Sequence, residues 1–399
     1  MLFTVVRWLA LAAAAAPALY YLAALACAWF FFRKRHEPMP DFCPPVSILK
    51  PMRGLDRETY QSLASFCRQR YLKYELLIST DSAQDAAIPV IQKLMADFPH
   101  IPIRLLIGTS ASGSSNKVTK LCRLAGEARY DLLVASDSDI RVDRDYLRRV
   151  VLPFRDRRVG AVTCLYRGRA SSSLWSELED VALTSDFLPG VLMARRLGVE
   201  FVLGATMAVR RQALDQIGGF EALADAAADD YELGSRIAAC GYRVEFADTT
   251  VETECSSQSL ANFWQHQLRW AVVARESRSW GHFGLLFAQG LPWAIVVAAL
   301  APSRTIAAGY AAAYLALRLG VAFAVGVWGL RDSLLRRKWW LVFLSDSFGF
   351  MVWLASLFAS RVVWQGSTYY VSNRRLIPLV PRACGIEQRP CASQKISSF

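Results

Sequence analysis

Residues 132–140 read Leu-Leu-Val-Ala-Ser-Asp-Ser-Asp-Ile, an apolar run that stops at two carboxylates, Asp137 and Asp139. An unbroken apolar run of this length is typical of a buried parallel strand. Open α/β sheets bind their ligands beyond the carboxyl ends of such strands. Two carboxylates separated by one small residue can share a hard divalent cation whose remaining ligands are water and substrate phosphates. An isolated Asp-x-Asp fits a solvated acidic turn equally well, so its interpretation depends on the rest of the chain.

Four short apolar runs predict an α/β domain between Pro44 and about residue 257. The runs alternate with stretches long enough for helices, which predicts a mostly parallel, doubly wound sheet. The runs are Val46–Leu49, Leu76–Ser79, Ile103–Ile107 and Leu132–Ala135. No Gly-x-Gly-x-x-Gly follows the first run, so nothing supports a dinucleotide-binding fold of that type.

Apolar segments at both ends predict membrane spans. Residues 1–33 form an anchor whose apolar part ends at Arg33-Lys34-Arg35-His36, and because this basic cluster follows the span, we prefer an anchor to a signal peptide. The positive-inside rule then places the α/β domain in the cytoplasm. In the C-terminal membrane region, 282–365, spans are expected at about 283–302, 306–328 and 339–360. Four crossings would leave the tail, 366–399, outside, although its arginines and the polar Ser345-Asp346-Ser347 favour a re-entrant last segment.

The amino-acid composition indicates which kinds of partner the protein binds. Hydrophobic residues make up 54% of the 399 residues and charged residues 20%, which indicates a membrane protein with a water-exposed domain. The net charge of +12 comes from Lys and Arg beside the apolar spans, so we expect a bilayer surface and no nucleic acid. The nine cysteines form no Cys-x-x-Cys pair, which argues against a disulfide framework or a zinc site.

Further polar motifs follow the strand-like runs. Asp81 ends the second run, where it can accept a hydrogen bond from a base or ribose or cap a helix. A Gly/Ser-rich loop, Gly108–Lys117, ends in Asn116-Lys117 and offers donors to a diphosphate, but it lacks the Gly-Lys-Ser/Thr of a P-loop. Asp229-Asp230 stands where a helix would begin. Residues 258–281 read as an amphipathic interfacial helix, and the interrupted segment 175–197 also predicts interfacial helices.

In their order and spacing these motifs resemble the ceramide glucosyltransferase family, glycosyltransferase family 21, and within it the bacterial branch associated with hopanoid biosynthesis. The motifs that carry the resemblance are Lys50-Pro51, Asp81, Asn116-Lys117, Ser136-Asp137-Ser138, Asp230 before Tyr231, and Arg269-Trp270. It covers residues 44–275 and the flanking spans, and it implies a GT-A catalytic domain over residues 44–257.

The resemblance implies a role for each matching residue. Asp230 would be the catalytic base, Arg269 would hold the leaving diphosphate, and Trp270 would border the acceptor. His266 departs from the first position of the family's Gln/Arg-x-x-Arg-Trp motif, which leaves its role open. The expected nucleotide-sugar contacts are Lys50, Asp81, Asn116, Lys117 and Asp137, the expected ligands of Mg²⁺ or Mn²⁺ are Asp137 and Asp139, and the expected acceptor lining is Gly204, Ala205, Thr206 and His266.

The resulting hypothesis is an inverting glycosyltransferase of the bacterial inner membrane that transfers a sugar from a UDP-sugar to a membrane lipid. The family at large implies ceramide and UDP-glucose, and the bacterial branch implies a hopanoid such as bacteriohopanetetrol and UDP-N-acetylglucosamine. A processive polysaccharide synthase shares the aspartates and Arg-Trp, but three C-terminal spans make a poor secretion channel. A transporter or receptor would carry charged residues inside its spans, where Asp346 and Arg318 are the only candidates.

Overall fold

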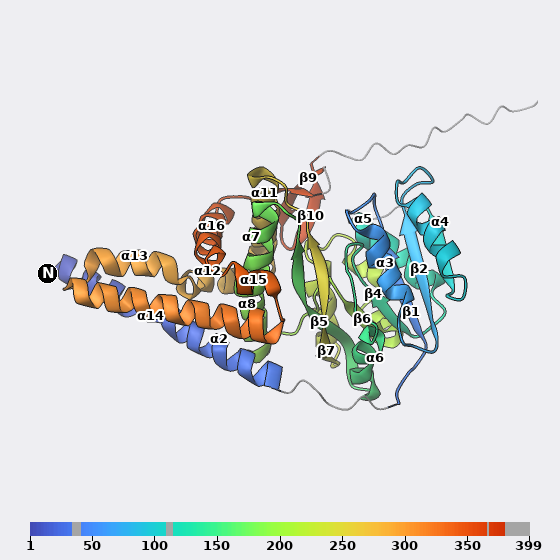
Figure 1. Cartoon of the computed structure of the whole chain (residues 1–399), viewed down its shortest axis with the longest axis horizontal. Coiled ribbons are helices and arrows are strands. Elements are labelled where there is room, and N and C mark those ends of the chain that lie inside the picture. The colour runs from blue at the N-terminus through green and yellow to red at the C-terminus, as the bar shows by residue number, and fades with distance from the viewer. Residues whose placement is uncertain (34–40, 109–114, 365–366, 380–399) are drawn as a thin grey trace, which may run out of the picture.

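The computed structural model describes residues 1–33, 41–108, 115–364 and 367–379. Three layers follow one another along the long axis of the molecule (Figure 1). An α/β domain occupies one end, long apolar helices extend from the other, and a layer of helices lies between them.

A seven-stranded sheet with the order β3-β2-β1-β4-β6-β5-β7 forms the α/β domain. Its strands are β1 (Val46–Pro51), β2 (Tyr74–Thr80), β3 (Ile103–Ile107), β4 (Leu132–Ala135), β5 (Val159–Ala170), β6 (Met207–Arg210) and β7 (Arg243–Cys255). The four predicted runs are the parallel strands β1 to β4, so that prediction is confirmed. The short β6 runs antiparallel between β4 and β5, and β5 pairs in parallel with β7.

Helices cover both faces of this sheet, which explains why its central strands are apolar without alternation. In β1, Ile48 packs into the core beneath α3, α4 and α6, whereas Leu49 packs beneath α5, α9 and α10. The helices of the domain are α3 (Thr59–Cys67), α4 (Ile88–Asp97), α5 (Asn116–Glu127), α6 (Tyr146–Val151), α9 (Arg211–Gln216) and α10 (Asp229–Ala239), with short 3₁₀ turns η1 (Leu152–Arg155) and η3 (Phe220–Leu223).

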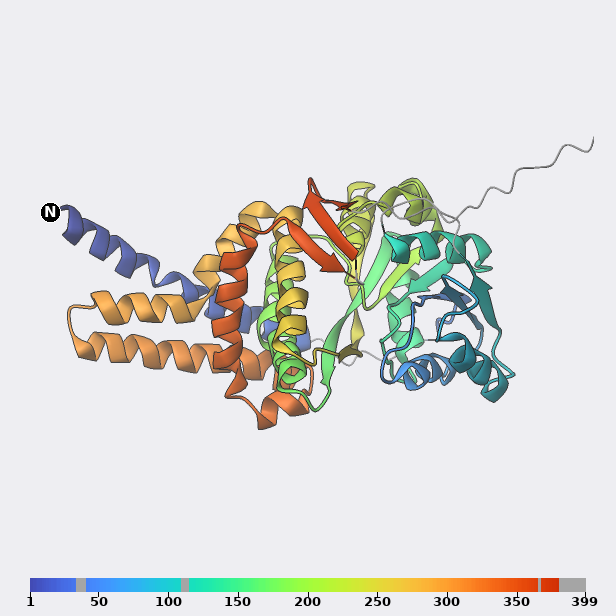
Figure 2. The ribbon, with the colours of Figure 1, turned by 90° about the horizontal axis from the view of Figure 1, so that it is seen from above.

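Two helices of the described chain are long and apolar enough to cross a membrane, or three if a pair bent by 51° is one span. They are α1–α2 (Leu2–Ala13 and Ala16–Arg33) and α14 with its π-helical end η4 (Arg304–Ala322 and Phe323–Gly329). The bent pair is α12 (Ser279–Ala288) and α13 (Gly290–Leu300). Together α2, α13 and α14 form the bundle that points away from the sheet (Figure 2).

The middle layer crosses the direction of this bundle (Figures 1 and 2). It comprises α7 (Leu174–Ala182), the π-helix η2 (Leu183–Phe187), α8 (Leu188–Arg196), α11 (Leu260–Ser277), α15 (Ser333–Arg337) and α16 (Leu341–Ser356). A buried ion pair joins the layer to the bundle, since Arg318 of α14 lies 2.6 Å from Asp346 of α16 and donates to the Ser185 carbonyl at 2.8 Å. Asp346, the charged residue inside the apolar segment 339–360, therefore has an ion-pair partner.

The third C-terminal span expected at about 339–360 has a different form. Helix α16 has 16 residues, which at about 1.5 Å per residue is shorter than the roughly 30 Å hydrocarbon core. The chain then forms a small antiparallel sheet, β8 (Arg361–Trp364), β9 (Ser367–Ser372) and β10 (Arg375–Pro378), which the sequence had not predicted. The sheet contacts the α/β domain, because Leu376 N donates to Asp225 O at 2.9 Å. The described part of the tail thus lies on the side of the α/β domain, in contrast to the four-crossing interpretation.

Candidate active site

The predicted polar residues converge at the carboxyl edge of the sheet. Asp137 follows β4, Lys117 lies in the first turn of α5, and Asp229 and Asp230 begin α10. Gly204 lies between these side chains: a Cβ at this position would stand 3.2 Å from Asp137 Oδ2 and 3.4 Å from both Asp230 Oδ2 and Lys117 Nζ. Segments that are far apart in the sequence thus form one cluster.

Lys117 is the cation at the centre of the cluster. Its Nζ lies 2.8 Å from Asp137 Oδ1 and 3.1 Å from Asp229 Oδ2. Burial lowers the pKa of Lys117, but the neighbouring carboxylates outweigh burial and raise it, so this side chain stays charged. For Asp137, burial raises the pKa, because it disfavours the charged carboxylate, and the positive charge of Lys117 opposes this shift.

Asp230 is held by two backbone donors. Gly204 N donates to Asp230 Oδ2 at 2.9 Å, and Tyr231 N donates to Oδ1 at 2.7 Å. Burial, followed by the charge of Asp229, raises the pKa of Asp230 to about 6. A carboxylate with a pKa near neutrality and a fixed orientation is suited to accept a proton from a substrate hydroxyl.

Two predicted site residues brace the Asp137 loop. Asp139 Oδ2 accepts from the Thr253 hydroxyl at 2.7 Å and from Glu254 N at 3.1 Å, which ties the loop to β7. Lys50 was expected to contact the nucleotide-sugar, but its side chain is completely buried, and its ammonium donates to the Asp137 carbonyl. Burial lowers the pKa of Lys50 to about 8. Lys50 therefore supports the loop from beneath, because β1 is covered on both faces.

Asp81 forms a second polar cluster with α5. Asn116 Nδ2 donates to Asp81 Oδ2 at 2.8 Å, and Lys120 Nζ lies 3.0 Å from Oδ1. Sequence reasoning missed Lys120, although it follows Lys117 by three residues and so lies on the same face of the helix. The rest of the predicted Gly/Ser-rich loop, residues 109–114, lies outside the described residues.

Arg269 of α11 interacts with the carboxylates from the middle layer of helices (Figure 1). Asp137, Asp230 and Asp229 all oppose the lowering of its pKa by burial. Within the described part of the chain Arg269 forms no hydrogen bond or ion pair, and its guanidinium lies 5.8 Å from the centre of the Trp364 ring. It is therefore available to an anionic ligand.

Trp270, the residue after Arg269, packs among aromatic side chains. The Trp270 ring lies 5.4 Å from Phe187 and 5.0 Å from the ring of His266. His266 Nδ1 bonds to Glu179 Oε1, a buried partner that sequence reasoning missed. His266 thus connects α11 to α7 and contacts Trp270.

Only Gly204 of the predicted acceptor segment 204–206 faces the carboxylate cluster. Thr206 is completely buried, its hydroxyl lies 3.0 Å from Tyr146 Oη, and its carbonyl accepts from Thr163. Ala205 is also buried. Thr206 thus packs in the core of the sheet, and we withdraw it and Ala205 as acceptor contacts.

The residues present suit a divalent cation that shares its ligands with a substrate. No group of three or more His, Cys, Asp or Glu in the described ranges could enclose a metal alone. The side chain of Asp137, however, is 38% exposed. Its Oδ1 contacts Lys117, and its second carboxylate oxygen, Oδ2, does not take part in that ion pair. Mg²⁺ and Mn²⁺ sites of this kind are completed by water and phosphate oxygens.

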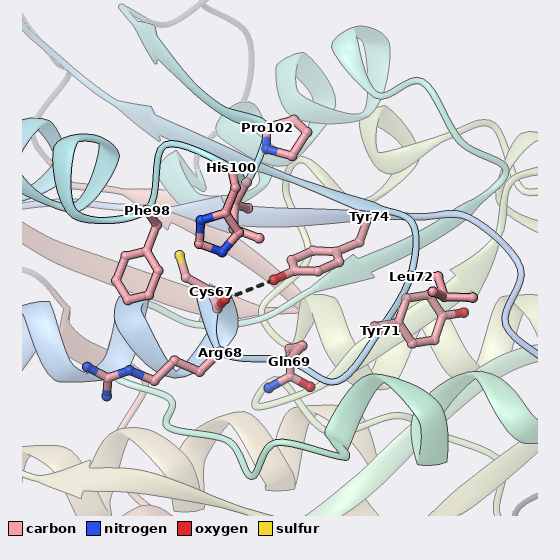
Figure 3. A pocket seen from close by; sticks show the side chains of 10 residues that line it. Cys67, Arg68, Gln69, Tyr71, Leu72, Tyr74, Phe98, His100 and Pro102 are labelled. Atoms are coloured by element: carbon pink, nitrogen blue, oxygen red, sulfur yellow. Dashed lines mark hydrogen bonds between the residues drawn. The ribbon is translucent and has the colours of Figure 1, made fainter.

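A hollow elsewhere in the α/β domain is separate from this site. It has a volume of about 430 Å³ and lies at the amino ends of β2 and β3, opposite the carboxylates. Tyr74, Phe98 and His100 line it, and Tyr74 Oη donates to the Cys67 carbonyl at 3.1 Å (Figure 3). Ligands of α/β sheets bind at the opposite edge.

Comparison with known proteins identifies relatives of this chain. The family model of glycosyl transferase family 21 matches residues 9–377. Ceramide glucosyltransferase 1 of Caenorhabditis elegans is 26% identical over 254 residues, which are 63% of this chain and 54% of the relative. The probable glycosyltransferase YdaM of Bacillus subtilis is 21% identical over 243 residues, 60% of this chain and 57% of the relative. The chain spans about half the length of these curated relatives.

The fold has a solved counterpart. The mannosyltransferase PcManGT of Pyrobaculum calidifontis, in complex with GDP-Man and Mn2+, superposes with a TM-score of 0.52 at 20% identity. The match covers 88% of this chain and 98% of that protein. The predicted GT-A architecture is therefore confirmed.

Proposed function

Since the chain belongs to glycosyltransferase family 21, we propose that it transfers a sugar, with inversion, from a UDP-sugar to a hydroxyl of a membrane lipid. One observation carries the proposal: Asp137, Lys117 and Asp230 meet around Gly204 at the carboxyl edge of the sheet, and Arg269 interacts electrostatically with the same carboxylates. Curated relatives named as ceramide glucosyltransferases support a lipid acceptor.

In the proposed reaction, Asp230 removes the proton of the acceptor hydroxyl. The oxygen then attacks the anomeric carbon of the sugar from the side opposite the diphosphate. As this bond forms, the bond from the anomeric carbon to the diphosphate oxygen breaks, and UDP leaves. The two backbone donors of Asp230 hold it in place for the proton transfer.

Negative charge develops on the diphosphate as it leaves, and Arg269 is placed to stabilise it. A guanidinium can bind two phosphate oxygens at once, which suits this task. Asp81, Asn116 and Lys120 would hold the nucleoside part at the start of α5. Lys117 would position Asp137 and balance the carboxylates.

A divalent cation would bind at Asp137 together with the donor diphosphate, with Asp139 fixing the loop through β7. When bound, it would supply a positive charge that neutralises the leaving group. The complex of the mannosyltransferase PcManGT with Mn2+ supports a divalent cation in this fold.

We further propose that the protein lies in a bacterial inner membrane with the α/β domain in the cytoplasm. The basic cluster after the first span supports this orientation. The contact between the tail sheet and the α/β domain supports an even number of crossings between them, which α13 and α14 supply.

The acceptor is tested by supplying membranes that contain the protein with labelled UDP-glucose or UDP-N-acetylglucosamine and with ceramide or a polyhydroxylated hopanoid. Each reaction is run with and without a chelator. Cation-dependent label in a single lipid band would support the proposal and identify the acceptor. A ladder of products would indicate a processive synthase, and label in no lipid, without release of UDP, would refute the function.

A further inference from the structure

The C-terminal sheet, β8 to β10, contacts both functional halves of the active site. We propose that it holds the catalytic carboxylate and the leaving-group arginine in register, and that Trp364 is a positioning residue for Arg269. This inference rests on the proposed function, in which Arg269 stabilises the departing diphosphate.

On one side, the sheet extends onto the segment that leads into α10. Ala227 N donates to Arg374 O at 2.9 Å, and Leu376 N donates to Asp225 O at 2.9 Å. These backbone bonds end only two residues before Asp229, at the start of the helix that carries Asp230. Arg374 also lies 3.6 Å from Glu232, in the first turn of α10.

On the other side, the sheet packs on α11. Val362, Tyr369, Val371 and Leu376 form a buried apolar cluster with Val272 of α11, and Leu268 packs against its edge. Leu268 and Val272 flank Arg269 in sequence. The cluster therefore fixes the turn of α11 from which Arg269 reaches the carboxylates.

Trp364 provides the direct contact. Its ring lies 5.8 Å from the Arg269 guanidinium and 6.2 Å from the Tyr369 ring, which holds the indole in place. Because Arg269 has no ion pair among the residues described, Trp364 is the contact that orients it before a ligand binds. An aromatic face attracts a guanidinium without neutralising it, so the positive charge stays available for the diphosphate.

A double-mutant cycle tests this inference in the full-length protein. Trp364→Ala should lower kcat about three- to thirty-fold and weaken UDP binding, the range that loss of a cation–π contact allows. In an Arg269→Ala background the same change should have almost no further effect, because the group it orients is gone. Trp364→Phe should restore most of the activity.

Val363→Ala is the matched control, since Val363 neighbours Trp364 on β8 but is 43% exposed. Thermal unfolding of each variant shows whether the fold is kept. If wild type transfers sugar but the Trp364 and Arg269 effects multiply, the inference is wrong and the proposed function stands. If Val363→Ala lowers kcat as much as Trp364→Ala does, the effect comes from the stability of the strand. That result would also overturn the inference. If wild type transfers no sugar, the proposed function fails and the inference fails with it.

Discussion

Replacing Asp230 by asparagine should separate catalysis from stability. Burial and Asp229 raise the pKa of Asp230 from 3.8 to about 6, so the folded protein holds this proton more tightly than the unfolded chain. The wild type therefore loses stability as the pH rises from about 4 to about 6. At about 1.36 kcal/mol per pH unit, the loss is about 3 kcal/mol.

Asparagine does not titrate in this range. It accepts only one of the two backbone hydrogen bonds from Gly204 and Tyr231, which adds a constant cost at every pH. The informative quantity is thus the variant's free energy of unfolding minus that of the wild type. This difference should rise by about 2 kcal/mol between pH 4 and pH 7, because part of the full loss occurs below pH 4.

At neutral pH the substitution that relatively stabilises the protein should lower its rate of sugar transfer. Asp230→Asn removes the base and should lower transfer about 10²- to 10⁴-fold while UDP binding survives. Wild-type transfer should fall about tenfold per pH unit below pH 6, the pKa of the base. Residual transfer by the variant should not follow that slope.

The assays are lipid transfer across pH and unfolding of the purified protein in detergent. Asp215→Asn, which removes an exposed carboxylate on α9, is the control for the loss of one charge. A stability difference that is flat between pH 4 and pH 7 would refute the burial argument. Transfer that survives in Asp230→Asn would refute its role as the base.

Three further predictions concern the site and the tail. Gly204→Ala should lower kcat/KM by about ten- to a hundredfold without unfolding the protein, since its Cβ would crowd Asp137 and Asp230; unchanged kinetics would show that the centre of the site is roomier than the structure indicates. Chelation should stop transfer and Mn²⁺ should restore it, with Asp137→Asn raising the Mn²⁺ concentration required; a larger shift from Asp139→Asn would make Asp139 the principal ligand. A membrane-impermeant maleimide should label Tyr370→Cys from the same side of the membrane as the exposed Cys240; labelling from opposite sides would contradict the position of the tail.

Much of the α/β domain could be predicted from local sequence. Strands buried on both faces require continuous apolar runs, so β1 to β4 are visible without tertiary information. The end of β4 also predicts where ligands bind, because the carboxyl edge of a parallel sheet is a general binding position. Asp137 is predicted in this way, whereas the roles of Asp230 and Arg269 were implied by the resemblance of their motifs to those of the family.

Only the tertiary structure decides which side chains of a motif face the active site. Gly204 and Thr206 are two residues apart, yet one borders the carboxylates and the other packs against Tyr146. Lys50 has the residue type of a phosphate ligand, but the cover on both faces of β1 buries it. Burial is a property of the assembled sheet and leaves no mark on the residue itself.

Long-range pairings were decided only in the folded chain. Sequence by itself determined the GT-A domain, its binding edge and the apolar segments at both ends. Tertiary structure decided that Lys120 pairs with Asp81, that Arg318 pairs with Asp346, and that the tail binds the segment before α10. The tail contact is made by backbone N–H and C=O groups, which every residue except proline carries, so no side-chain pattern predicts it.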